Sequence, residues 1–181
     1  QLCFDAAQFL DASMARGRAA VLFSATLTPF PYFIQTLGGG EDALRIQLES
    51  PFPADHYCLL AADGVSTKYA RREDTLKTVC DMISAAADAH RGNYIAFFPT
   101  YKYMQAAAEL LAQEHPALAL AVQESGMDEA ARAAFLARFD AGNAETLLGL
   151  CVLGGVFAEG IDLAGERLVG SIIVGVGLPQ V

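Results

Sequence analysis

The chain has 181 residues, of which 54% are hydrophobic and 18% charged; its formal net charge is −9 and its isoelectric point is near 4.7. This hydrophobicity excludes intrinsic disorder and predicts a sizeable core. The acidic balance argues against binding nucleic acid through bulk positive charge, although it permits a local basic groove. No apolar run reaches the roughly 18 residues that a membrane helix needs, so no membrane contact is expected.

The first part of the chain predicts two helices and three strands. Apolar residues at helical spacing indicate an amphipathic helix over Leu2–Met14. The apolar run Ala19–Thr26 predicts a buried strand, and "TPFPYFIQTLGGG" predicts a short helix that ends at Gly38. Further strands are expected in "LRIQL" and near Tyr57–Ala61.

The second part alternates strands and helices in a regular way. The predicted elements are a helix capped by Asp74 and ended at Gly92, a strand over Tyr94–Pro99, a helix capped by Thr100 and ended at His115 and Pro116, a strand over Leu118–Val122, a helix from Asp128 through Phe139, a strand in "TLLGLCVL", and a strand over Gly170–Val176. Strands that alternate with helices of this length predict βαβ units and a mainly parallel sheet, the α/β class.

The four cysteines contain no CxxC pair, so no zinc or iron–sulfur site is expected in this chain. Cys3, Cys58, Cys80 and Cys151 are predicted to be small core residues of a reducing compartment. No secretory signal opens the chain. Together these features predict a cytoplasmic protein.

In parallel sheets, ligands bind beyond the carboxyl ends of the strands. Four polar or glycine-rich exits follow apolar strands in this sequence: Ser24–Thr28, Pro99–Lys102, Gln123–Met127, and the stretch after Leu153. These are the candidate places for chemistry.

The first two exits carry hydroxyl and aromatic groups. Ser24 and Thr26, around Ala25, could bond a neighbouring loop, a water or a phosphate oxygen; the alternative is a local turn that satisfies its own backbone. Thr100 opens a helix whose free N–H groups suit a phosphate. Tyr101 and Tyr103 could stack on bases, or could pack at the edge of the core.

The stretch from Gly154 to Leu168 places Glu159, Asp162 and Glu166 between glycines. A carboxylate there could accept a hydrogen bond from a ribose hydroxyl or orient a water near a phosphate. The alternative is a solvated turn in which Glu166 and Arg167 pair. No GxxxxGK[ST] phosphate loop is present, so the main phosphate cradle of any bound nucleotide would lie elsewhere.

The basic residues are scattered, apart from one cluster, "KYARR", over Lys68–Arg72. Such a cluster could make local contacts to phosphates, or it could be a solvated loop.

Three segments, in this order, resemble the C-terminal half of DinG/XPD-type superfamily-two DNA helicases. They are "VLFSATLTPFPYFIQTLGG", "GNYIAFFPTYKYM" and "VLGGVFAEGIDLAGERLVGSIIVGVGLPQ". The most specific part is "EGIDL" followed by "GERL" and "GVGLPQ". The resemblance covers about Arg18 to Gln180 and implies a truncated RecA-like fold, with a mainly parallel sheet flanked by helices.

The resemblance also implies roles for three motifs. Motif III would couple the state of the nucleotide to strand separation, the motif IV region would track single-stranded DNA, and motif V would link the nucleotide cleft to the DNA path. The matching residues are Ser24, Ala25 and Thr26 for motif III; Phe98, Pro99, Thr100 and Tyr101 for motif IV; and Gly155 to Asp162 for motif V, with Glu159, Gly160 and Asp162 at the joint. Thr100, Tyr101, Lys68 and Gly155 are the predicted nucleic-acid contacts.

The family pattern also has parts that this sequence lacks. The phosphate loop, the Mg²⁺-binding acidic box and the cysteines of an iron–sulfur cluster would lie before Gln1, and the arginine-rich motif VI would follow Gln180. We therefore expect a fragment: residues 1–50 end the first RecA-like domain, and residues 51–181 form most of the second. ATP and Mg²⁺ would act in the full-length protein, and the fragment alone would bind no cofactor and hydrolyse no ATP.

Two functions fit this interpretation. The first is part of a 5′-to-3′ DNA helicase, whose partners are single-stranded DNA, ATP and the first RecA-like domain. The second is a noncatalytic RecA-like module that holds nucleic acid or a protein without transport. A stand-alone nucleotide enzyme is disfavoured because the phosphate cradle is missing. Because neighbouring strands would be absent, we also expect residues 1 to about 50 to repack or self-associate.

Overall fold

The computed structural model describes residues 5–40 and 42–176. The chain divides into two compact units, Gln1–Leu59 and Leu60–Val181, and each is described by itself. None of the helices within the described residues is both long and apolar enough to cross a bilayer.

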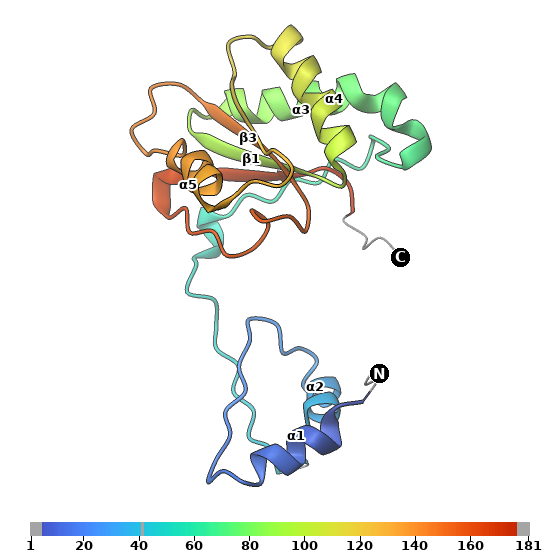
Figure 1. The fold of residues 1–181 in the computed structure, drawn as a ribbon, viewed down its shortest axis with the longest axis vertical. Helices are drawn as coiled ribbons and strands as arrows, with labels where there is room; N and C mark the ends of the chain where they lie inside the picture. Colours follow the sequence, from blue (N-terminus) through green and yellow to red (C-terminus); the bar gives the residue numbers. More distant parts are fainter. Residues whose placement is uncertain (1–4, 41, 177–181) are drawn as a thin grey trace. The chain divides into compact units, whose positions relative to one another are not determined.

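The first unit is helical and otherwise irregular (Figure 1). It contains α1 (Ala7–Met14), α2 (Phe30–Leu37) and the short 3₁₀ helix η1 (Ala54–His56). Gly38 ends α2 with φ of 81°, a conformation that favours glycine. The Asp11 carboxylate of α1 accepts a hydrogen bond of 2.7 Å from the Gly39 N–H and so joins the two helices. The predicted helices are confirmed over these residues; Leu2 to Phe4 lie outside the described residues.

The three strands predicted for this region are wrong. Residues 19–26, 44–48 and 57–61 form no strand, and their large apolar side chains are exposed, Val21 to 83% and Phe23 to 91%. An apolar run becomes a strand only where a neighbouring strand takes up its N–H and C=O groups. Among the described residues, none of these three runs has such a neighbour.

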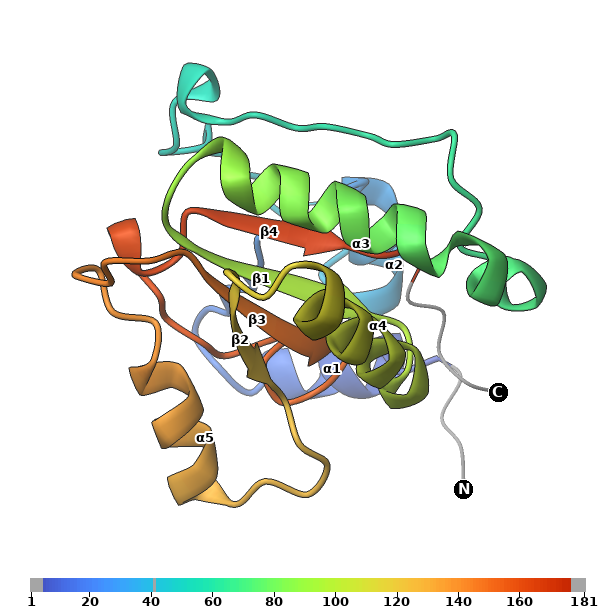
Figure 2. The ribbon, with the colours of Figure 1, turned by 90° about the horizontal axis from the view of Figure 1, so that it is seen from above.

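The second unit is an α/β sandwich with a four-stranded, all-parallel sheet of order β2-β3-β1-β4. Its strands are β1 (Asn93–Phe98), β2 (Ala119–Val122), β3 (Leu147–Val152) and β4 (Gly170–Ile173), and its helices are α3 (Arg72–Ala89), α4 (Tyr101–Glu114), α5 (Glu129–Ala137) and the 3₁₀ turns η2 (Tyr69–Arg71) and η3 (Gly165–Arg167). Figure 2 shows α3 and α4 on one face of the sheet and α5 on the other. This confirms the predicted α/β fold.

Alternating residues of the central strands fill two cores. Ala96 and Phe98 of β1 face α3 and α4, whereas Ile95 faces the core of α5. Gly149 in β3 has a specific packing reason: a Cβ there would lie 2.6 Å from the ring of Phe139, so glycine makes room for this buried aromatic.

Two of the three predicted helix caps are confirmed. Thr100 and Asp128 each accept a hydrogen bond from the backbone N–H three residues later, at 3.3 and 2.8 Å. The cap predicted for Asp74 is wrong, because α3 begins two residues earlier, at Arg72. The Asp74 carboxylate instead lies in the first turn and accepts a hydrogen bond of 2.9 Å from Arg71 Nε. A carboxylate near the start of a helix stabilises it either as the N-cap or, inside the first turn, through the helix dipole. The sequence pattern alone did not distinguish these two positions for Asp74.

Two cysteines are core residues as predicted, and one is not. Cys80 and Cys151 are buried, and burial raises the pKa of the first thiol to about 11 and of the second to about 12. Cys58 is exposed, because the segment around it forms no strand that could bury it. Cys3 lies outside the described residues.

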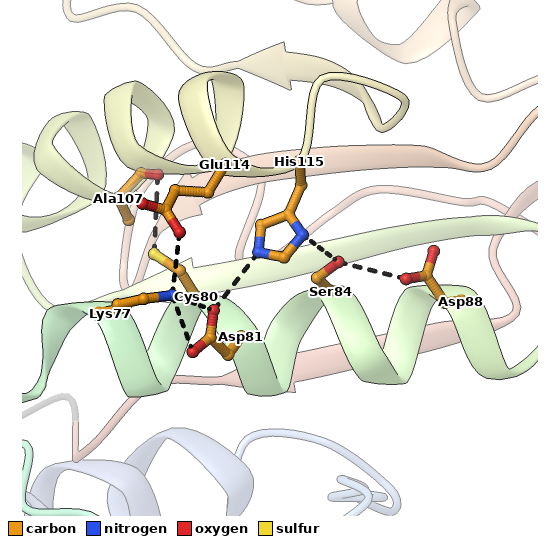
Figure 3. A network of polar contacts seen from close by, with 8 residues as sticks. All are labelled: Lys77, Cys80, Asp81, Ser84, Asp88, Ala107, Glu114 and His115. Atoms are coloured by element: carbon orange, nitrogen blue, oxygen red, sulfur yellow. Dashed lines mark hydrogen bonds and ion pairs between the residues drawn. The ribbon is translucent and has the colours of Figure 1, made fainter.

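A polar network joins α3 to the end of α4 (Figure 3). Lys77 Nζ lies 3.0 Å from an oxygen of Asp81 and 2.9 Å from an oxygen of Glu114. Hydrogen bonds to Glu114 and Asp81 raise the pKa of Lys77, and the bond to Lys77 lowers the pKa of Asp81. His115 Nδ1 lies 3.0 Å from Ser84 Oγ, and its Nε2 lies 3.5 Å from Asp81. These groups connect α3 to the C-terminal end of α4.

Candidate functional site at the carboxyl edge of the sheet

The carboxyl ends of the four parallel strands bring separate segments of the chain to one edge. Backbone hydrogen bonds continue the pairing just beyond the strand ends, from Leu153 N to Phe98 O (2.8 Å) and from Gln123 N to Leu150 O (2.9 Å). The exits predicted after β1, β2 and β3 therefore lie together. The exit predicted at Ser24–Thr28 belongs to the first unit, which is described by itself.

Gln123 connects three of these segments. Its side chain is 1% exposed. Nε2 donates a hydrogen bond of 2.8 Å to the hydroxyl of Tyr101, and Oε1 accepts one of 2.9 Å from Val152 N. Gly155 lies directly against this amide, since a Cβ there would be 3.2 Å from Nε2 and 2.9 Å from the Val152 oxygen. The end of β2 thus joins the start of α4 to the exit of β3.

The stretch after β3 is fixed by apolar side chains. Phe157 is buried, and its ring stacks on Phe135 of α5 with centroids 4.4 Å apart. Glu159 and Asp162 are exposed, whereas the apolar residues on either side of Asp162 are half-buried in the same core. Gly160 has φ of 73°, a conformation that favours glycine. The apolar residues therefore fix the backbone that carries the exposed carboxylates.

Arg167 fastens this stretch to α5. Its guanidinium donates hydrogen bonds to three carbonyl oxygens: Nε to Phe139 (3.0 Å), Nη2 to Leu136 (3.3 Å) and Nη1 to Asp162 (3.4 Å). A cation near the last carbonyls of a helix is favourable. The Glu166–Arg167 ion pair of the solvated-turn interpretation is wrong: within residues 5–40 and 42–176, no ion pair joins them.

The residues predicted to contact nucleic acid occupy different environments. Tyr101 is half-buried, with its hydroxyl on Gln123, and Thr100 caps α4. Tyr103 is 5% exposed and packs edge-to-face on Phe98, with centroids 5.5 Å apart. Tyr103 therefore packs in the core and offers no face to a base, which is the second of the two alternatives that the sequence left open for it.

Lys68 is exposed and belongs to a segment at the same edge. The preceding residue, Thr67, lies against Gly175 after β4, where a Cβ would be 2.8 Å from the threonine hydroxyl oxygen. The aromatic side chain beside Lys68 is Tyr69, which is 81% exposed. Tyr69 was not among the residues predicted from the sequence, although its position within the only basic cluster could have suggested it.

Ser24, Ala25 and Thr26 form an exposed turn in the first unit. Thr26 N donates a hydrogen bond of 3.2 Å to Ser24 Oγ. This is the self-satisfied local turn that the sequence left open as an alternative to a ligand-binding strand end.

The candidate site is an exposed surface. One hollow of the second unit, of about 440 Å³, lies at the opposite edge, against Ala119 and Leu147 at the starts of β2 and β3. Within the described residues, no group of three or more histidine, cysteine, aspartate or glutamate side chains could hold a metal ion.

The model of a protein family described as "Helicase C-terminal domain" matches residues 83–181. The chain belongs to this helicase C-terminal domain family. The match includes all four strands, α4, α5 and the last part of α3 from Ile83 onward, so Gln123, Tyr101 and the Gly155–Asp162 stretch lie inside it. It confirms the helicase part of the resemblance seen in the sequence motifs.

A probable ATP-dependent helicase of Methanocaldococcus jannaschii is similar to this helicase C-terminal domain. The two are 31% identical in an alignment 149 residues long, which covers 78% of this chain and 22% of that protein. The chain thus spans less than a quarter of its relative's length.

Proposed function

We propose that this helicase C-terminal domain is part of a DinG/XPD-type, ATP-dependent DNA helicase that moves 5′-to-3′ on single-stranded DNA. Residues 1–50 would end its first RecA-like domain, and residues 51–181 would form the second. The observation that carries the proposal is the hydrogen-bonded connection from Tyr101 through Gln123 to the exit of β3. It joins the segments matching motifs IV and V at one edge of the sheet.

The DNA side of this edge would use the start of α4. Its free N–H groups favour a phosphate, and the Thr100 hydroxyl keeps a proton to donate while its oxygen caps the helix. Tyr101 and Gly155 both lie next to the Gln123 amide, and Lys68 adds a cation. We propose these four residues as DNA contacts.

The nucleotide side of this edge would use Glu159, Gly160 and Asp162. For Ser24, Ala25 and Thr26, in the first unit, we propose the separate motif III role of coupling the nucleotide state to strand separation. Exposed carboxylates can accept hydrogen bonds from ribose hydroxyls but repel phosphates. The sequence has no GxxxxGK[ST] phosphate loop, and among the described residues no group of three or more histidine, cysteine, aspartate or glutamate side chains could hold a metal ion. We therefore propose that the first RecA-like domain holds the phosphates of ATP, Mg²⁺ and any iron–sulfur cluster.

The connection through Gln123 supplies a mechanical link. Val152 N fixes one end of the amide, and the Tyr101 hydroxyl holds the other. Displacement of Tyr101 by DNA would either break the 2.8 Å hydrogen bond or pull on the end of β3, where motif V begins. Movement along DNA and the nucleotide state would be coupled in this way.

The test is ATP hydrolysis by the complete protein that carries this chain, with and without single-stranded DNA. A Glu159→Gln variant is compared with Glu166→Gln, which removes an exposed carboxylate from the same stretch. We expect strong stimulation by DNA that Glu159→Gln loses and Glu166→Gln keeps. An absence of hydrolysis in every condition would contradict the proposal and favour the noncatalytic module. An equal loss of DNA stimulation in both variants would show that Glu159 has no specific role in coupling the nucleotide to DNA.

A further inference from the structure

Tyr69 forms the exposed end of an aromatic column. The guanidinium carbon of Arg72 lies over its ring, 5.5 Å from the centroid, and 5.0 Å from the centroid of Tyr103. Tyr103 is buried and packs on Phe98 in the core. The column therefore runs from the core of the second unit to a tyrosine ring that is 81% exposed.

Contacts with Thr67 hold the column in place. Arg72 Nε donates a hydrogen bond of 3.2 Å to the carbonyl oxygen of Thr67, which fixes the guanidinium between the two rings. Thr67 itself lies against Gly175. A cation over a tyrosine face is attracted by the ring quadrupole, so Arg72 stabilises the position of Tyr69. Because Arg72 already restricts the Tyr69 side chain, a flat group that stacked on this ring would cost less side-chain entropy on binding.

The charge around this ring is positive, although the chain carries −9 overall. Lys68, Arg71 and Arg72 lie within five residues, followed by Glu73 and Asp74. Arg71 is paired with Asp74, whereas Lys68 is exposed and precedes Tyr69 directly. An exposed aromatic face beside an exposed ammonium group suits a nucleobase and its adjoining phosphate.

We propose that Tyr69 is a stacking platform for a base of single-stranded DNA, with Lys68 contacting a neighbouring phosphate. The inference rests on the proposed function and deepens it. It moves base stacking from the buried Tyr103 to Tyr69, which lies at the same carboxyl edge through Thr67 and Gly175.

The 181-residue chain itself allows a direct test, because it has six tyrosines and no tryptophan. The probes are a fluorescently labelled thymidine oligonucleotide of about 12 nucleotides and an abasic strand of equal length. Anisotropy gives the affinity, and intrinsic tyrosine fluorescence, read with unlabelled strands, reports stacking. The variants are Tyr69→Ala, Tyr69→Phe and Lys68→Ala, with Tyr57→Ala as the control for another exposed tyrosine.

We expect Tyr69→Ala to weaken binding of the thymidine strand about 5- to 100-fold and to remove most of the quenching. Binding of the abasic strand should not change. Tyr69→Phe keeps the ring and should retain the affinity for the thymidine strand, and Tyr57→Ala should resemble the unaltered chain. Lys68→Ala should weaken binding of both strands and reduce the salt slope by about 0.7.

The outcomes separate the two proposals. If the thymidine strand binds and Tyr69→Ala leaves its affinity unchanged, or weakens both strands equally, the platform is refuted while DNA binding stands. If the unaltered chain binds neither strand, the platform is also refuted. The motor proposal then depends on hydrolysis by the complete protein, which does not involve Tyr69.

Discussion

Replacement of Gln123 by leucine tests the central connection of the candidate site. Leucine keeps a similar bulk but removes the donor to the Tyr101 hydroxyl and the acceptor for Val152 N. The Val152 N–H is buried and would be left unsatisfied, at a cost of about 1–3 kcal/mol. The half-buried Tyr101 hydroxyl can turn toward water, so the loss of its hydrogen bond from Gln123 costs about 0.5–1.5 kcal/mol. We expect a decrease of about 1.5–4.5 kcal/mol in the free energy of unfolding.

Urea unfolding of the chain, followed by far-ultraviolet circular dichroism, measures this decrease. Most of the helices and all of the strands within the described residues belong to the second unit, so the signal reports mainly on the unit that contains Gln123. The matched control is Gln105→Leu, the same change at an exposed position of α4, which should alter stability by about 0.5 kcal/mol or less. A loss below about 1 kcal/mol in Gln123→Leu would mean that the amide does not hold these segments together.

Three further predictions concern the cores and the helix pair. Thiol alkylation followed by mass spectrometry should modify Cys58 before Cys80 and Cys151, because burial shields the latter two thiols and raises their pKa values; equal rates would contradict their burial. Gly149→Ala should lower the free energy of unfolding by about 1–3 kcal/mol in the same urea assay, since its Cβ would meet a buried ring, and no change would show that the core yields freely. Asp81→Asn should destabilise the chain at neutral pH. Its neighbouring lysine lowers the carboxyl pKa, so that contribution disappears as pH falls below about 4; a difference that persists in acid would refute this.

The second unit was predictable because its signals are local. Thr100 and Asp128 precede helical patterns and cap the helices that form there. The four strands coincide with apolar runs of the length expected for a strand. The run Ala19–Thr26 has the same composition but forms no strand. Whether an apolar run becomes a strand depends on a neighbour that the run does not specify.

The candidate site was predictable in place but not in contacts. Gln123 stood in one of the predicted exits, yet its partners Tyr101 and Val152 lie 22 and 29 residues away in the sequence. Tyr103 shares a helix face with buried residues four and eight positions later, so the helical period could have assigned it to the core. No such period covers Tyr69, which sits in a 3₁₀ turn, and its exposure became evident in the structure.

The net charge and the aromatic column both bear on how this chain would hold DNA. A chain with a net charge of −9 would repel DNA at long range, so under the proposed function contacts at short range would have to supply the affinity. Base stacking does not depend on net charge and tolerates every sequence, as a translocating motor requires. The exposed carboxylates at Glu159 and Asp162 would add to this repulsion and keep DNA on the part of the edge that carries the proposed contacts, Thr100, Tyr101, Gly155, Lys68 and Tyr69. Acidic and aromatic groups would thus divide one edge of the sheet between nucleotide and DNA.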